Sequence, residues 1–208
     1  MARYTGSVCR LCRTEGTKLF FKSTRCLTEK CAFNKRAYSP GQHGKKRSKL
    51  SDYALQLREK QKVRRVYGVS EQQFRRYFKN AEKSRSVTGT VLLQSLERRL
   101  DSVVFNLGFA LTRAQARQMV KHNFLLVNAR PVNVPSYLVR PKDILSIRND
   151  EAKRKKIREI VKLTKDKEVP VWLQSEPEKL EGAVLRLPER ADIRFPVREQ
   201  LIVELYSK

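Results

Sequence analysis

The sequence lacks most of what catalysis or membrane insertion would require. Among its 208 residues there are only two histidines, His43 and His122, and neither has a nucleophile or carboxylate partner at a spacing typical of a catalytic site. It contains no nucleotide-binding glycine loop and no cofactor fingerprint. It also has no run of about 18 apolar residues, and its first residues lack the apolar core of a signal peptide. We therefore expect a cytoplasmic protein that is not an enzyme.

Acidic residues are scarce. Asp and Glu number 21 against 46 Lys and Arg, which gives a net charge of +25 and a pI near 10.4. Because such self-repulsion does not help an isolated chain to fold, a polyanion is the expected partner. The basic residues occur in almost every segment, unlike those of a single amphipathic membrane helix. Nucleic acid is therefore a better match than an anionic membrane.

Cysteine is absent after the first 31 residues. The four thiols, Cys9, Cys12, Cys26 and Cys31, form two pairs that can supply a tetrahedral metal site. A short segment rich in Lys and Arg cannot build its own core, so a metal would provide much of its folding energy. Zinc is the expected ion, and an iron–sulfur cluster is an alternative that uses the same ligands. Two disulfides are disfavoured because nothing indicates an oxidising compartment.

The periodicity of the chain predicts an α+β fold with helices in the middle. A helix should begin at the Ser51-Asp52 cap and end at Gly68, a second should start at Ser70, and a third should run from Thr88 to Leu107. We expect three consecutive parts: a basic metal-binding segment over 1–48, a basic helical domain over 49–90, and a nucleic-acid-binding domain over 91–208 with its core at 98–147.

The segment 98–147 reads as two short helices followed by antiparallel strands. Its second helix begins with a capping box at Thr112 and should stop at Asn123, which tolerates a left-handed conformation. Arg113, Arg117 and Lys121 follow one another at intervals of four, so they should form one ridge of cations. We predict that this ridge binds phosphates, although a solvated face is the alternative.

A second cationic surface is expected in the first half of the chain. A turn-rich loop, AYSPGQHG, is followed by a basic run, and the next predicted helix carries a basic stripe. The residues assigned to this surface are Arg36, His43, Lys45, Lys46, Arg47, Arg58, Lys62 and Arg65.

The C-terminal third is less clearly patterned. Residues 149–168 are highly charged and predict either a helix or a solvated spacer. Trp172, the only tryptophan, is expected to be a core anchor. Residues 183–187 and 200–206 have strand character, and these strands should extend the sheet or pack the tail onto the helical middle.

The stretches GTVLLQSLERRLDSVVFNLGFALTRAQARQMVKHNFLLVN, AYSPGQHG and LPERADIRFPVREQLIVELYSK, with the four-cysteine N-terminus, resemble the bacterial ribosomal protein S-four family. The resemblance covers nearly the whole chain. It implies a structural protein of the small ribosomal subunit that binds the 5′ domain of the ribosomal RNA early in assembly. It also implies a place near the mRNA entry site beside ribosomal proteins S-three and S-five, an influence on decoding accuracy, and possible repression of its own operon.

The chain departs from the family pattern at two turns. Asn128-Ala129 replaces the usual Asn-Gly, and Pro141-Lys142-Asp143 replaces the usual Pro-Gly-Asp. If either turn keeps a positive φ, a residue other than glycine costs roughly 1 kcal/mol there.

Two other kinds of protein are alternatives to a ribosomal protein. An RNA-modifying enzyme would need a catalytic domain, and the segments that flank 98–147 contain none. A zinc-dependent DNA-binding regulator would need a recognition helix beside the cysteine pairs, and none is evident between Cys12 and Cys31.

Overall fold

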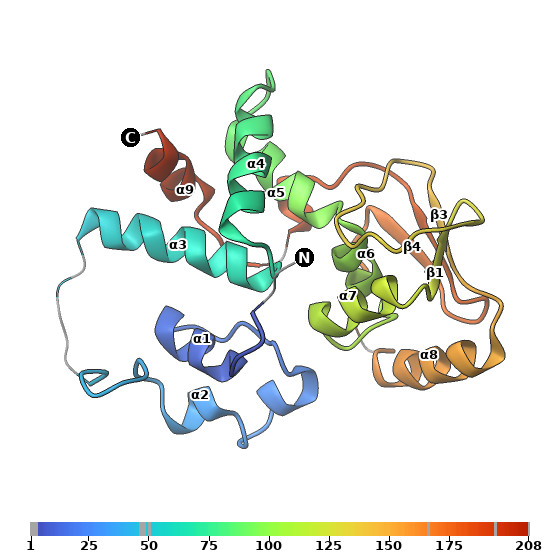
Figure 1. Cartoon of the computed structure of the whole chain (residues 1–208), viewed down its shortest axis with the longest axis horizontal. Coiled ribbons are helices and arrows are strands. Elements are labelled where there is room, and N and C mark those ends of the chain that lie inside the picture. Colours follow the sequence, from blue (N-terminus) through green and yellow to red (C-terminus); the bar gives the residue numbers. More distant parts are fainter. Residues whose placement is uncertain (1–3, 46–48, 50, 166, 194, 208) are drawn as a thin grey trace. The chain divides into compact units, whose positions relative to one another are not determined.

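The computed structural model describes residues 4–45, 49, 51–165, 167–193 and 195–207. It confirms an α+β fold and divides into two compact units (Figure 1). Unit 1 comprises Met1–Gly89 and Pro196–Lys208, and unit 2 comprises Thr90–Phe195. The sequence predicts three consecutive parts, with a C-terminal tail that extends the sheet or packs onto the helical middle, and the structure joins both ends of the chain in one unit.

Unit 1 is helical in the residues described. Its elements are α1 (Val8–Glu15), the 3-10 turn η1 (Ser23–Cys26), α2 (Ala32–Lys35), α3 (Asp52–Val66), α4 (Glu71–Glu82) and α9 (Glu199–Tyr206). The predicted helix starts are confirmed by their caps. Ser51 Oγ accepts a hydrogen bond from Ala54 N at 3.3 Å, and Ser70 Oγ accepts one from Gln73 N at 3.4 Å.

The end of the chain differs from the prediction. Residues 200–206 were expected to form a strand, but they lie in α9, which packs along α3. Helical spacing buries Ile202 fully and, one turn later, places the Tyr206 ring 4.5 Å from that of Phe78 on α4. Alternation over so short a run cannot distinguish a strand from a helix when its partner is distant in sequence.

Unit 2 combines helices with a small sheet. After α5 (Thr88–Glu97), which begins at the boundary between the units, come α6 (Leu100–Asn106), α7 (Arg113–Lys121), β1 (Leu125–Val127), β2 (Arg130–Pro131) and β3 (Ile144–Ile147). They are followed by α8 (Glu151–Leu163), β4 (Leu173–Glu176), β5 (Glu181–Val184) and the 3-10 turn η2 (Arg190–Asp192). The charged segment 149–168 thus contains a helix and is not only a spacer.

The prediction of a single helix over 88–107 is wrong, because the helix is interrupted at Arg98 and Arg99. Arg99 is extended, and the backbone around it bonds to a distant segment instead of to the preceding turn. Leu100 N donates to Tyr137 O at 2.9 Å, and Val139 N donates to Arg98 O at 3.0 Å. This long-range pairing ends one helix and starts the next.

The five strands within the described residues are antiparallel neighbours in the order β2-β1-β3-β5-β4. β5 therefore extends the sheet as expected from residues 183–187, although its bounds are Glu181–Val184. The central register pairs Leu126 with Ser146 and Leu145 with Gly182. The order brings β1 and β3 of the expected core segment into one sheet with the C-terminal strands.

Two turns lie at one end of this sheet, and both keep a positive φ without glycine. Ala129 has φ 63° and Lys142 has φ 72°. Asn128 joins the turns: its Nδ2 donates to Asp143 Oδ1 at 2.9 Å, and its Oδ1 accepts from Ile144 N at 2.9 Å. Tertiary hydrogen bonds therefore hold the turn shape in spite of the backbone strain.

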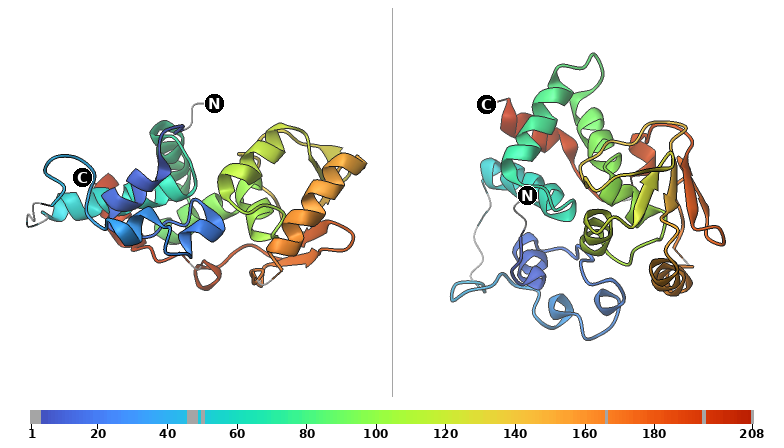
Figure 2. Two further views of the ribbon diagram at one scale, coloured as in Figure 1. Left: turned by 90° about the horizontal axis from the view of Figure 1, so that it is seen from below. Right: turned by 45° about the vertical axis from the view of Figure 1, so that its right-hand side comes forward.

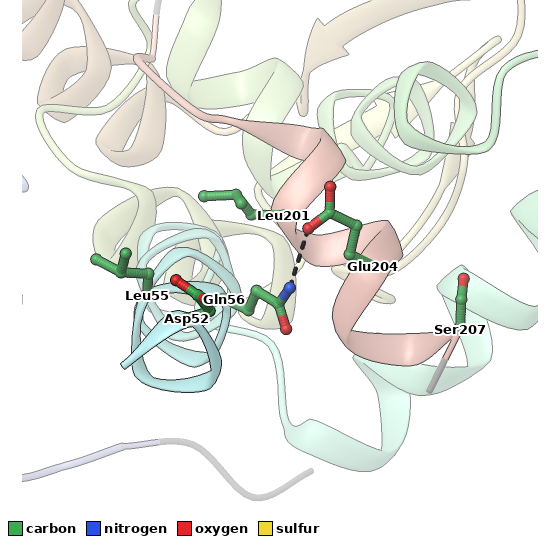
Figure 3. A pocket seen from close by; sticks show the side chains of 6 residues that line it. All are labelled: Asp52, Leu55, Gln56, Leu201, Glu204 and Ser207. Atoms are coloured by element: carbon green, nitrogen blue, oxygen red, sulfur yellow. Dashed lines mark hydrogen bonds between the residues drawn. The ribbon is translucent and has the colours of Figure 1, made fainter. Parts of the chain in front are cut away.

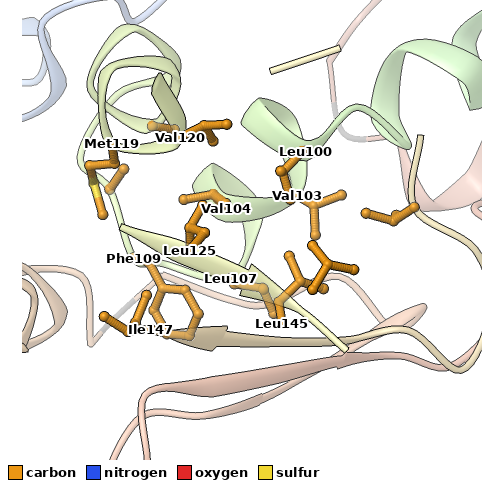
Figure 4. Packing of buried hydrophobic residues seen from close by; sticks show 14 of the residues in the cluster. Leu100, Val103, Val104, Leu107, Phe109, Met119, Val120, Leu125, Leu145 and Ile147 are labelled. Carbon is orange, nitrogen blue, oxygen red and sulfur yellow. The ribbon is translucent and has the colours of Figure 1, made fainter. Parts of the chain in front are cut away.

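The main hydrophobic core lies in unit 2, between α6, α7 and the sheet (Figure 4). Val104, Leu125 and Leu145 are fully buried in it. Trp172 is 1% exposed in the same cluster, which confirms it as a core anchor. α8 adds its buried Ile157, and Figure 2 shows this helix from two further directions.

Candidate nucleic-acid interface

The helix α7 carries the first set of predicted cations, and its ends form as the sequence predicts. Thr112 Oγ1 accepts a hydrogen bond from Gln115 N at 3.1 Å, while Gln115 Oε1 accepts one from Leu111 N at 2.8 Å. The helix stops before Asn123, which adopts a left-handed φ of 56°. These caps fix the direction in which the cations of α7 leave the helix.

The three cations of α7 do not form one exposed ridge. Lys121 is exposed, Arg113 is partly buried, and Arg117 is only 5% exposed. The guanidinium of Arg113 lies 3.5 Å from a carboxylate oxygen of Glu97 and 4.6 Å from the ring centroid of Phe105. Equal spacing along the helix therefore does not give equal access to solvent, because α6 covers one side of α7.

Arg117 belongs to a buried ionic cluster. Its Nη1 lies 3.9 Å from Asp101 Oδ2, and Asp101 also receives two hydrogen bonds from Arg99, at 3.1 and 2.8 Å. Arg99 is fully buried and Asp101 is 3% exposed. Glu97, which pairs with Arg113, is also buried, so neither carboxylate forms an ordinary surface ion pair. Glu97 accepts a hydrogen bond from Asn106 at 2.7 Å.

The predicted basic stripe on α3 is partly occupied within unit 1. Arg65 pairs with Glu15 of α1, Arg58 lies 3.7 Å from the same carboxylate, and Lys62 pairs with Glu59. Burial raises the pKa of Glu15, although the charges of Arg65 and Arg58 oppose the shift. Its fully buried carboxylate therefore joins α1 to α3 through two cations of the predicted second surface.

The turn-rich loop leaves its charged side chains in solvent. Arg36, His43 and Lys45 are exposed, and the Lys45 ammonium lies 5.5 Å from the ring centroid of Tyr38. The Arg13 guanidinium lies 5.2 Å from the centroid of the same ring and donates to Tyr38 O at 3.0 Å. The predicted contacts Lys46 and Arg47 lie outside the described residues.

The four cysteines lie near one another in unit 1. Cys9 is partly buried, the other three are buried, and none forms a disulfide. Burial raises the pKa of Cys12, and the charges of Cys9, Cys26 and Cys31 add to the effect. In residues 4–45 and the rest of the described chain, however, no three Cys, His, Asp or Glu side chains are grouped closely enough to hold a metal ion. The structure does not show the expected metal knuckle.

Backbone amides already point at two of these thiols. Lys22 N donates to Cys26 Sγ at 3.3 Å. Burial acts to raise the pKa of Cys31, but the backbone N–H groups of Asn34 and Phe33 and the charges of Lys18 and Arg25 lower it below its usual value. Backbone N–H groups therefore point at two of the four thiols, as they do in thiolate sites, whereas burial opposes the thiolate form of Cys12.

The helix α8, none of whose residues is among the predicted RNA contacts, presents several cations to solvent. Lys155, Lys156, Arg158 and Lys162 are all exposed and, in the part of the chain that the structure describes, form no ion pair. The sequence feature that pointed to these cations was the high charge of residues 149–168, but charge alone does not distinguish a helix face from a solvated spacer.

No helix within the described residues is long and apolar enough to cross a membrane.

Comparison with known families assigns residues 3–145 to one class of protein. Residues 3–97 match the Ribosomal protein S4/S9 N-terminal domain, and residues 98–145 match the S4 domain. With its basic α+β fold, the chain is therefore a non-catalytic RNA-binding protein of the ribosomal class.

Full-length relatives make the assignment specific. The chain is 57% identical to the small ribosomal subunit protein uS4 of Thermodesulfovibrio yellowstonii and to uS4A of Symbiobacterium thermophilum, each over 208 residues and the whole of both chains. It is 56% identical to uS4 of Caldicellulosiruptor bescii over 210 residues. The chain belongs to the small ribosomal subunit protein uS4 family and is a structural constituent of that subunit.

Proposed function

We propose that this protein binds the 5′ domain of the small-subunit ribosomal RNA and nucleates assembly of that domain. The observation that carries this proposal is the set of exposed cations on separate elements. Arg36, Lys45 and Lys121 lie in solvent and, among the described residues, form no ion pair with a carboxylate. Such cations release counterions from RNA when they meet phosphates, which favours binding.

Recognition should depend mainly on RNA shape. The major groove of A-form RNA is too narrow for side chains, so phosphates and sugars offer most of the contacts. Arg113 and Arg117 would contribute less directly than Lys121, because internal carboxylates already hold them. Arg58, Lys62 and Arg65 remain part of the proposed second surface together with His43, Lys46 and Arg47.

The test is binding to a transcript of the 5′ domain over a series of salt concentrations. The double variant Arg36→Ala/Lys45→Ala should weaken binding about 10-fold and reduce the salt slope by about 1 to 2. Lys179→Ala is the matched control, because Lys179 is exposed but lies 2.8 Å from Glu176. Equal affinities for wild type and the double variant would rule out this surface, and no binding by wild type would rule out the 5′ domain.

We further propose that the protein lies beside other small-subunit proteins near the mRNA entry site, where it influences decoding accuracy. The family resemblance suggests ribosomal proteins S-three and S-five as neighbours. A hollow of about 510 Å³ between α3 and α9 supports a protein contact (Figure 3). Glu204 accepts a hydrogen bond from Gln56 at 2.9 Å there, beside the exposed Asp52 and Leu55. Carboxylates repel RNA, so this face suits a basic protein segment.

Decoding accuracy and self-regulation can be tested separately. Leu55→Lys should weaken contact with a basic neighbouring protein, because it places a cation on this acidic face, and should change the error frequency in a reporter translation assay, whereas 5′ domain binding should stay within about 3-fold of wild type. An unchanged error frequency would contradict the accuracy role.

Repression of the protein's own operon predicts that the purified chain lowers translation of that message but not of an unrelated message.

A metal ion is the last part of the proposal. Cys9, Cys12, Cys26 and Cys31 would hold zinc as a four-thiolate structural site, and an iron–sulfur cluster is the alternative. Elemental analysis of protein purified without air distinguishes the two ions. Cys9→Ser should release the metal and unfold the first forty residues while unit 2 stays folded. A metal-free wild-type protein with the same circular dichroism as the metal-loaded form would contradict the proposal.

A further inference from the structure

Unit 2 contains a hollow with an apolar lining and a cationic rim. It has a volume of about 440 Å³, within the range of ~300–1,000 Å³ that is usual for ligand pockets. The end of α6, the second half of α8 and the turn after β4 surround it. Leu107, Val161, Val169 and Pro177 provide the apolar lining.

Specific hydrogen bonds fix the walls of this hollow. Thr164, just beyond α8, donates through Oγ1 to Gly108 O at 2.7 Å, and Ser175 Oγ donates to Leu107 O at 3.2 Å. Gly108 has φ 83°, and a Cβ there would lie 3.2 Å from Thr164 Oγ1. The three elements are thus held together locally, so the hollow is a built feature and not a gap between loose loops.

The rim is strongly biased toward positive charge. Arg158, Lys162 and Lys165 are exposed and make no ion pair within the described residues, while Glu178 is the one acidic residue among those that line the hollow. The complementary ligand has a flat apolar part and an anionic group beside it. A nucleotide has both, because its base can pack on apolar side chains while its phosphate meets the cations.

We propose that this pocket holds one unpaired nucleotide of the small-subunit ribosomal RNA, with its base against Val161 and Pro177 and its phosphate at Lys162 and Lys165. The proposal deepens the RNA-binding function proposed above and rests on it. A free nucleotide is a weaker match, because the cations are separate flexible side chains and no glycine-rich loop encloses the phosphate. A nucleotide tethered in bound RNA has a high effective concentration at the pocket and overcomes that weakness.

The first test uses purified small ribosomal subunits, so it does not depend on which RNA domain the protein binds. Ultraviolet cross-linking followed by mass spectrometry should give a nucleotide adduct on a peptide that contains Lys162 or Lys165. The matched control is the neighbouring part of α8 with Lys155 and Lys156, which are exposed but do not line the pocket. Adducts confined to the control peptide, or none on either, would overturn the proposal.

The second test compares two variants with the same change in charge. Lys162→Ala/Lys165→Ala should weaken binding to small-subunit RNA about 10-fold and make one base reactive to chemical probing, whereas Lys155→Ala/Lys156→Ala should weaken it less than about 3-fold without exposing a base. If both double variants weaken binding equally and show the same base reactivity, the cations of the rim attract RNA only by their charge, and the pocket holds no nucleotide. If the wild-type protein does not bind the 5′ domain but still gives the nucleotide adduct, the proposed RNA domain is wrong and the nucleotide pocket stands.

The third test addresses the source of the ligand. Adenosine and uridine monophosphates should not bind the free chain saturably below about millimolar concentration. Saturable binding that the Lys162→Ala/Lys165→Ala variant loses would assign the pocket to a free nucleotide and overturn the RNA assignment.

Glu178→Gln should change RNA affinity in the opposite direction to the lysine variants. It should tighten RNA binding about 2- to 3-fold, since it removes the acidic group from the rim.

Discussion

Nη1 of Arg117 lies 3.9 Å from Oδ2 of Asp101, on the buried side of α7. The same carboxylate receives two hydrogen bonds from Arg99, so two arginines share one acidic partner inside unit 2. A residue selected by its spacing as a phosphate contact is therefore also part of the ionic cluster that joins α6 to α7. Its loss should affect stability as well as RNA binding.

Arg117→Ala should lower the free energy of unfolding of unit 2 by about 1–3 kcal/mol, because it leaves buried Asp101 with Arg99 alone. The fluorescence of Trp172, the only tryptophan, reports urea unfolding of this unit. Lys121→Ala is the control on the same helix and should change stability by less than about 0.5 kcal/mol. Equal losses in the two variants would mean that the cluster does not stabilise the unit.

Ala129→Gly should raise the free energy of unfolding by about 0.5–1 kcal/mol, because glycine removes the strain of a positive φ of 63°. Arg130→Gly, one residue later in β2 and without a positive φ, should lower it by a similar amount. Trp172 fluorescence during urea unfolding measures both. A loss of stability in Ala129→Gly would show that the turn adopts another shape in solution.

Glu71 should make the stability of unit 1 depend on pH. Burial acts to raise its pKa, but hydrogen bonds from Lys60 and Tyr206 and the Lys60 charge outweigh this and hold the pKa below its usual value. A lowered folded-state pKa stabilises the protein above the unfolded value of about 4.3, and this contribution is lost as pH falls through the folded value.

The corresponding variant is Glu71→Gln, compared with wild type by far-UV circular dichroism during unfolding. Because Glu71 is partly exposed, the expected loss at pH 7 is only about 1 kcal/mol. The difference from wild type should disappear near pH 3. Glu178→Gln, in unit 2 and without an ion pair within the described residues, should show no such pH dependence in the helical signal of unit 1. A difference that persists at pH 3 would contradict the assignment to ionised Glu71.

Ile202→Ala should destabilise unit 1 by about 2–5 kcal/mol, because it removes a fully buried side chain from the contact between α9 and α3. Val203→Ala, next in sequence but only partly buried, should cost about 1 kcal/mol. Thermal unfolding followed by far-UV circular dichroism compares the two. The reverse ranking would favour the strand expected from the sequence, in which Leu201, Val203 and Leu205 share one face.

The residues at the helix ends determine those ends locally, so the sequence predicts them. The serine and threonine caps at Ser51, Ser70 and Thr112, and the left-handed Asn123, depend on side-chain chemistry within a few residues. The excess of 46 basic over 21 acidic residues predicts a polyanionic partner without reference to any contact. The family membership follows from motifs spread along the whole chain.

Long-range contacts decided the rest. Backbone pairing with Tyr137 and Val139 breaks the helix predicted over 88–107, and packing on α3 and α4 makes residues 200–206 a helix. The access of each cation was also decided this way: Arg117 faces buried Asp101, while Lys121, one turn later on the same helix, faces solvent. Spacing along the chain determines the angle of a side chain around its helix. Only the packing of the neighbouring elements determines whether that angle points to solvent or to a buried partner.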